Sequence, residues 1–126
     1  MISKKFTRDI IRHTMHVHSL LGPGLLESTY QEALYYSLKK SGYYVEKEKP
    51  MPVIFEEARL DCGYRIDLLV EDKLVLELKA VKVLNEVHMA QLLTYLKLGR
   101  FELGLLLNFN VVHMRDGIKR IINSEE

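Results

Sequence analysis

Two short apolar runs in the middle of the chain, residues 63–70 and 74–80, decide most of what it can fold into. Both are strand-length and rich in Leu and Val, and only Glu71, Asp72 and Lys73 separate them, so they predict a β-hairpin. In the second run apolar residues occur at neighbouring as well as alternating positions, which is typical of a strand buried on both faces. Both faces of such a strand must be covered. With helices expected before and after these strands, the sequence predicts an α/β fold with a helix on each side of a central mixed sheet.

Three charged residues stand within these apolar strands: Asp67 in the first, and Glu77 and Lys79 in the second. Residues two apart on a strand share a face, so Glu77 and Lys79 point the same way. If Val70 pairs with Leu74, Asp67 lies directly opposite Glu77, at roughly 5 Å. Two carboxylates that close repel each other unless a cation or a proton joins them. The alternative is an internal ion-pair network with Lys79, although such networks are seldom favoured over apolar packing.

Oxygen ligands without cysteine or an obligatory histidine suit a hard divalent cation, so we expect Mg²⁺ or Mn²⁺ at the two carboxylates. Lys79 would stand beside that ion, placed to position or deprotonate a water molecule. Zinc is another possibility, because the first predicted helix carries His13, His16 and His18. Their spacing scatters them around that helix and no cysteine joins them, so we interpret them as surface or core side chains.

An Asp, a gap of nine residues and then Glu-x-Lys resembles the PD-(D/E)XK nuclease superfamily. Further blocks make the chain similar to one group of bacterial and archaeal proteins, the GxxExxY family, whose signature falls on residues 24–30. The resemblance runs in order through nearly the entire chain and implies a restriction-endonuclease-like, three-layer α/β/α fold with an αβββαβ core. The blocks that carry it are residues 17–24, 24–30, 65–70, 88–96, 104–110 and 116–120.

The resemblance also implies a metal-dependent site. The two strand carboxylates and the backbone carbonyl of Leu78 would bind the ion, and Glu27 would complete the site directly or through water. Gln91 would hold Lys79 and the backbone of the site in register, as a glutamine does in RecB-like members of the superfamily. The catalytic residues expected on this basis are Lys79, Glu77, Asp67, Glu27 and Gln91.

The side chains around this site allow two interpretations each. Glu27 begins the stripe of its helix that Leu34 and Leu38 continue, so we expect it on the core-facing side, although an acid near a helix N-terminus is favourable anyway. Tyr30 either hydrogen-bonds at the site or packs. The supporting side chains His88, Gln91 and Tyr95 share one helix face, which either meets the site or turns to water.

The chain is predicted to form a single domain over residues 1–126, with elements in the order α-α-β-β-β-α-β-β. Residues 43–55 predict one strand, kinked at residues 50–52 where two prolines cannot donate hydrogen bonds. Residues 103–108 predict another strand buried on both faces. A terminal hairpin is expected from residues 111–114 and 118–122, and helices are expected at residues 7–20, 24–40 and 86–98.

A net charge of +1 is low for a protein that binds nucleic acid, because such proteins usually carry a basic excess. Any basic surface must therefore be local. Two copies related by a two-fold axis would double it and would cover the apolar edge of the terminal hairpin, so we expect a homodimer through that hairpin. The alternative is a monomer whose first helix covers that edge. The cations expected to contact nucleic acid are Lys82, Lys97, Arg100, Lys119 and Arg120.

The lone cysteine, Cys62, excludes an internal disulfide framework and fits a reducing compartment. No apolar run approaches the roughly 20 residues of a membrane span. We therefore expect a cytoplasmic protein without a membrane partner. The expected function is Mg²⁺- or Mn²⁺-dependent hydrolysis of phosphodiester bonds in nucleic acid, DNA in preference to RNA. The alternative is a catalytically inactive module that has kept the fold and binds nucleic acid or a protein.

Overall fold

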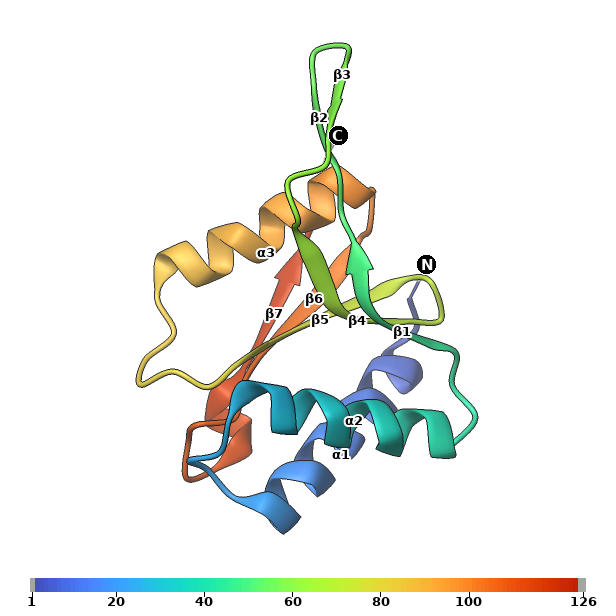
Figure 1. Ribbon diagram of the computed structural model, residues 1–126. Coiled ribbons are helices and arrows are strands. Elements are labelled where there is room, and N and C mark those ends of the chain that lie inside the picture. Colours follow the sequence, from blue (N-terminus) through green and yellow to red (C-terminus); the bar gives the residue numbers. More distant parts are fainter. Residues whose placement is uncertain (1, 125–126) are drawn as a thin grey trace.

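A mixed sheet of five strands lies at the centre of the protein, with helices on both of its faces (Figure 1). The computed structural model describes residues 2–124. The helices are α1 (Lys4–Leu21), α2 (Glu27–Lys40), α3 (Glu86–Gly99) and the 3-10 helix η1 (Met114–Gly117). The strands are β1 (Val45–Pro50), β2 (Val53–Phe55), β3 (Ala58–Leu60), β4 (Arg65–Val70), β5 (Leu74–Lys79), β6 (Leu103–Asn108) and β7 (Ile118–Ile122).

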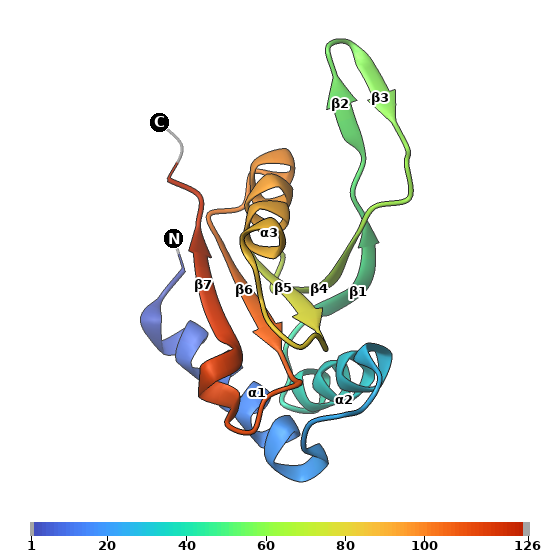
Figure 2. The same cartoon turned by 90° about the vertical axis from the view of Figure 1, so that its left-hand side faces the viewer.

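The sheet has the order β1-β4-β5-β6-β7, in which β5 and β6 run parallel and the other neighbours are antiparallel. Helices α1 and α2 cover one face and α3 covers the other (Figure 2). On the first face Leu76 packs in one cluster with Leu34 of α2, and on the second Val75 packs with Leu92 of α3. The three layers and the series α2-β1-β4-β5-α3-β6 confirm the predicted α/β/α fold and its αβββαβ core.

The central hairpin, β4–β5, has the predicted register. Val70 pairs with Leu74, and the Lys73 N–H donates to the Val70 carbonyl at 3.1 Å to close the turn. Glu71 and Asp72 take left-handed φ values of 54° and 56° there. Residues 74–78 of β5 are all buried, as the apolar run predicts, because helices cover both faces of this strand.

The predicted single strand over residues 43–55 is wrong. β1 ends at Pro50, and the chain then forms a separate two-stranded hairpin, β2–β3, that projects away from the sheet (Figures 1 and 2). The prolines at 50 and 52 explain the break, because neither can donate to a neighbouring strand. Between them the Met51 N–H donates to the Tyr64 carbonyl at 2.8 Å, which joins the two ends of this projecting arm, residues 53–60.

The predicted terminal hairpin is also wrong, because residues 111–114 form no strand. Strand β7 pairs directly with β6 instead, starting with Ile118 opposite Leu107. The chain reverses through η1, whose last residue, Gly117, lies against the backbone carbonyl of Asn108. A Cβ at Gly117 would meet that oxygen at 2.1 Å, so this reversal requires glycine.

The boundaries of all three helices differ slightly from the prediction, and α2 begins at Glu27 rather than at residue 24. Helix α1 begins at Lys4 rather than at residue 7, because the Ser3 hydroxyl caps it by accepting the Phe6 N–H at 3.1 Å. Helix α3 includes Gly99 and ends at Arg100, which is left-handed with φ 60°. Within residues 2–124 no helix combines the length and the apolar character that a membrane span requires.

Candidate active site

Asp67 and Glu77 lie side by side at the end of the paired region of β4 and β5, where backbone N–H groups donate to carboxylate side chains. The last backbone pair before them is Leu68 with Leu76, and one further step of the same register sets Asp67 opposite Glu77. There the Asp67 N–H donates to Glu77 Oε1 at 3.3 Å, and the Leu78 N–H donates to Asp67 Oδ2 at 2.8 Å. The backbone therefore fixes both carboxylates beside each other.

The two carboxyl groups are difficult to ionise together. Burial, and then the charge of the neighbouring Asp67 carboxylate, raise the pKa of Glu77 to about 8. Burial likewise raises the pKa of Asp67 to about 6, although the hydrogen bond from the Leu78 N–H opposes this. Glu77 is only 5% exposed, and no ion pair within 4 Å reaches either carboxylate in the described part of the chain. The pair therefore requires a proton or a cation.

Lys79 follows on the same face of β5 and is held by helix α3. Its ammonium group donates to Gln91 Oε1 at 3.2 Å, so the structure brings this lysine and this glutamine together. Tyr95, one turn further along α3, is buried, and its pKa is raised by burial and then by the charge of Glu77, which places it near the carboxylates. The face of α3 that bears Gln91 and Tyr95 is thus turned to the site and not to water.

His88, the third residue predicted on that face, serves its own helix. Its Nδ1 accepts the Asn85 N–H at 3.1 Å, and its own N–H donates to the Asn85 side chain at 3.0 Å. These reciprocal bonds form a capping box at the start of α3. The side chain of His88 therefore fixes the helix that carries Gln91.

Glu27, the first residue of α2, is exposed, so the expectation of a core-facing side chain is wrong. The buried part of α2 begins with Tyr30 and Gln31, one turn further on, because the first turn of the helix extends beyond the packed core. The charge of Glu27 nevertheless contributes to raising the pKa of both Asp67 and Glu77. Glu27 therefore lies close enough to the pair to contribute to its negative potential.

Tyr30 packs and fixes a turn. Its ring stacks on Phe109 with centroids 4.5 Å apart and an interplanar angle of 11°. Its hydroxyl donates to the Gly22 carbonyl at 2.5 Å and accepts the Leu25 N–H at 3.1 Å. Tyr30 therefore shapes the segment that leads into Glu27.

Glu48 is a further carboxylate at the site, which the sequence analysis missed. The pairing of β1 with β4 places it opposite Asp67, on the side away from Glu77, and its charge contributes to raising the pKa of Asp67. Its backbone is left-handed, with φ 54°, and its Oε2 accepts the Nε2–H of the buried Gln31 at 3.2 Å. The sequence shows a glutamate at this position but does not show that it lies opposite Asp67 in the sheet.

Asn108, at the end of β6, is a second missed residue. Its side chain is buried and binds both backbone groups of Val81, accepting the N–H at 3.0 Å and donating to the carbonyl at 2.9 Å. These two bonds fix the chain just after Lys79. A polar residue that closes a fully apolar strand is the signal that could have identified it.

The five predicted nucleic-acid contacts do not form one surface. Lys82 lies three residues after the end of β5. Lys97 on α3 and the C-cap residue Arg100 lie six and nine residues beyond Gln91, roughly 9–14 Å further along the helix axis. Lys119 and Arg120 are neighbours on β7, so they point to opposite faces of the sheet.

The donor set at the site suits a hard cation. Within residues 2–124 no three His, Cys, Asp or Glu side chains gather as a ready metal cluster, and the zinc alternative finds no support. His13 hydrogen-bonds the Ser37 hydroxyl and His18 the Val111 carbonyl, each at 2.7 Å. Asp67 and Glu77, by contrast, are two neighbouring carboxylates that form no ion pair within 4 Å in the described residues, and their oxygen atoms suit Mg²⁺ or Mn²⁺.

Among the comparisons with known proteins, a family model matches the chain. No curated protein and no solved structure matches the chain. The family model of the PD-(D/E)XK nuclease superfamily matches residues 4–121, a span that includes every element described above except the last residue of β7. The protein therefore belongs to the PD-(D/E)XK nuclease superfamily.

Proposed function

We propose that this protein is a divalent-metal-dependent nuclease that hydrolyses phosphodiester bonds in nucleic acid, DNA in preference to RNA. The observation that carries the proposal is the buried pair Asp67 and Glu77, which forms no ion pair within 4 Å in residues 2–124 and lies beside a lysine that Gln91 positions. A structural ion-pair network would give the carboxylates a cationic partner, and none lies within 4 Å in residues 2–124.

Asp67, Glu77 and the carbonyl of Leu78 would hold Mg²⁺ or Mn²⁺, with Glu27 in contact directly or through water. The N–H and C=O of a strand residue point to the same edge, so the Leu78 carbonyl faces the Asp67 side, as its N–H does. When bound, the ion polarises the phosphate and lowers the pKa of the attacking water.

Lys79 is the side chain of the protein that would provide positive charge at the scissile phosphate. Its ammonium group has three N–H donors, and Gln91 accepts one of them. The remaining two orient the attacking water and stabilise charge that builds on the phosphate oxygens. Gln91 acts through Lys79, so it is a positioning residue.

A second candidate is an inactive member of the fold that binds nucleic acid or a protein. The exposed side chain of Glu27 and the low net charge of +1 favour it. Against it, a site without chemistry has no need for Asp67, Glu77 and Lys79 together.

A cleavage assay decides between the two. Purified protein is incubated with single-stranded DNA, duplex DNA and RNA, each with Mg²⁺ or Mn²⁺ and with EDTA. We expect metal-dependent cleavage that is abolished in Glu77→Gln and in Lys79→Ala, and retained in Glu46→Gln and Lys39→Ala as matched controls. Cleavage that survives both site substitutions would overturn the assignment, whereas no cleavage of any substrate would favour the binding module.

A further inference from the structure

Helix α1 has a more positive net charge than the entire chain. Its four basic residues and one carboxylate give it a formal charge of +3, whereas the entire chain carries +1, so the remaining residues together carry −2. None of the cations that the sequence analysis assigned to nucleic acid lies on this helix. The charged residues of α1 are Lys4, Lys5, Arg8, Asp9 and Arg12.

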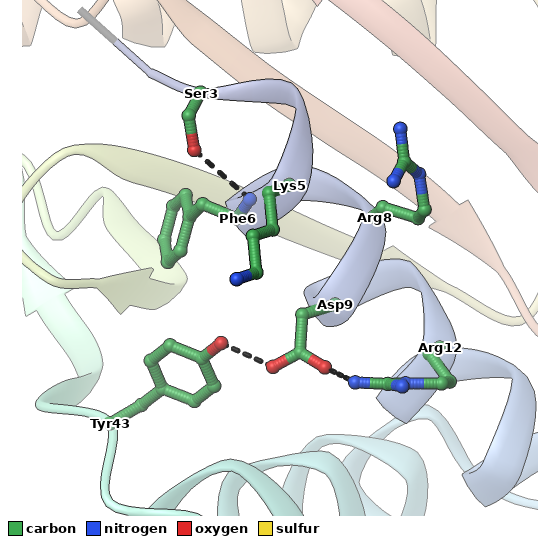
Figure 3. Close-up of a pocket in the computed structure, with 7 residues that line it drawn as sticks. All are labelled: Ser3, Lys5, Phe6, Arg8, Asp9, Arg12 and Tyr43. Carbon is green, nitrogen blue, oxygen red and sulfur yellow. Dashed lines mark hydrogen bonds and ion pairs between the residues drawn. The ribbon is translucent and has the colours of Figure 1, made fainter.

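Three of these cations line a hollow of about 590 Å³ between α1 and Tyr43 (Figure 3). Lys5, Arg8 and Arg12 follow the spacing i, i+3, i+7, so they form one stripe that extends roughly 10 Å along the helix. Phe6 forms part of the wall, and the ammonium of Lys73 lies 4.8 Å from its ring, which brings a fourth cation to the rim.

The single carboxylate of the hollow is already neutralised. Asp9 pairs with Arg12 and also accepts a hydrogen bond from the Tyr43 hydroxyl (Figure 3). Lys5 and Arg8 are exposed, and in the part of the chain that the structure describes neither forms an ion pair. The hollow therefore offers free cationic donors to an anionic ligand.

We propose that this hollow binds the phosphate backbone of nucleic acid, at a distance from the candidate active site. The inference rests on the proposed function for its choice of ligand. Arg and Lys are the side chains that most often contact phosphates, and such contacts position a strand without reading its sequence. A stripe of roughly 10 Å matches about three successive nucleotides, at about 3.4 Å for each along one strand.

The hollow and the active site lie at opposite ends of β5. Lys73, at the rim, precedes this strand, and Lys79 ends it, so the two are roughly 20 Å apart along the strand. A nucleic-acid strand that reaches both must therefore span at least about six nucleotides. The hollow thus binds a part of the substrate that lies away from the scissile bond, and only a longer strand contacts the hollow and the active site together.

Binding in EDTA tests this without any need for cleavage. Fluorescence anisotropy compares the wild-type protein with Lys5→Ala/Arg8→Ala, using labelled single-stranded and duplex DNA of about 20 nucleotides. The matched control is Lys39→Ala/Arg115→Ala, which removes one exposed lysine and one exposed arginine that are not among the expected nucleic-acid contacts. We expect about tenfold weaker binding for the α1 variant. For single strands, the slope of the logarithm of the binding constant against the logarithm of the salt concentration should be smaller in magnitude by about 1.4, or about 0.7 for each phosphate that is no longer neutralised. The control should bind as the wild type does.

An equal loss in both double variants would overturn the proposal, because binding would then follow net charge and not this hollow. Unchanged binding in the α1 variant would overturn it as well. If that variant lost binding only to vesicles of phosphatidylserine and phosphatidylcholine, the hollow would be a membrane contact instead. If the protein cleaves nucleic acid but the α1 variant binds as the wild type does, only the proposal for the hollow is contradicted. If the α1 variant loses binding but the wild-type protein does not cleave, only the nuclease proposal is contradicted.

Discussion

The Asp67 N–H donates to Glu77 Oε1 at 3.3 Å, so one carboxylate of the candidate site is bound by the backbone that carries the other. The Leu78 N–H completes the arrangement by donating to Asp67 Oδ2 at 2.8 Å. Because both donors are backbone groups of adjacent strands, the hairpin itself sets the separation of the two acids. The site is thus formed by folding, before any cation binds.

The metal-free protein should become less stable as the pH rises. Unfolded carboxyl groups titrate near pH 4, whereas the folded pKa is about 6 for Asp67 and about 8 for Glu77. The native state therefore keeps protons that the unfolded state has lost. The stabilisation is complete below about pH 4 and disappears as the pH rises through about 8.

Glu77→Gln should flatten this dependence and raise the free energy of unfolding by roughly 2 kcal/mol above pH 8. Urea denaturation in EDTA across this pH range measures both effects. Glu46→Gln is the control, because Glu46 pairs with Lys49 and lies outside the buried pair. A variant with the same pH slope as the wild type would show that Glu77 is ionised normally.

Gln91→Ala should slow cleavage by roughly ten- to a hundredfold, because the ammonium of Lys79 loses the acceptor that positions it. Mn²⁺ affinity should not change, since Gln91 is not a metal ligand in this account. Gln91→Glu, which restores an acceptor, should recover part of the rate. Thr94→Ala, an exposed position on the same helix, is the control. A parallel loss of metal affinity would show that Gln91 acts on the carboxylates and not on the lysine.

Glu48→Gln should weaken Mn²⁺ binding by about threefold, because a negative charge near Asp67 is removed. The same substitution should lower the pKa of Asp67 in the metal-free protein, which NMR titration detects. Glu46→Gln, two residues away on the same strand, should change neither quantity. If Glu48→Gln bound Mn²⁺ as tightly as the wild type, Glu48 would have no part in the site.

Tyr30→Phe should destabilise the fold by about 1–3 kcal/mol, because the Gly22 carbonyl and the Leu25 N–H lose their shared partner while the stacking on Phe109 remains. Urea denaturation measures this cost. Tyr36→Phe should be neutral, since Tyr36 is 67% exposed. Equal stability of the two variants would leave Tyr30 as a packing residue only.

The parts that the sequence predicted well are those with local causes. The β4–β5 hairpin follows from two apolar runs and a short turn, and its register sets Asp67 beside Glu77. The link between Lys79 and Gln91 was expected from a motif. Glu48 was missed because its place depends on β1 pairing with β4, which lies about 20 residues further along the chain.

The errors arose where backbone constraints outweigh apolar pattern. The prolines at 50 and 52 convert one predicted strand into β1 and the projecting arm, and Gly117 permits the tight reversal that pairs β7 with β6. The terminal hairpin proposed as a dimer contact does not exist in that form, although β7 is an edge of the sheet. The homodimer itself stays a prediction, and light scattering of the purified protein would test it.

Calorimetric titration of EDTA-treated protein with Mn²⁺ at about pH 8 tests the central claim, that Asp67 and Glu77 form a divalent-cation site. The account predicts a Kd on the order of micromolar for the wild type and for Glu46→Gln, and no measurable binding for Asp67→Asn or Glu77→Gln. Unchanged affinity in Asp67→Asn, or no binding by the wild type, would contradict it.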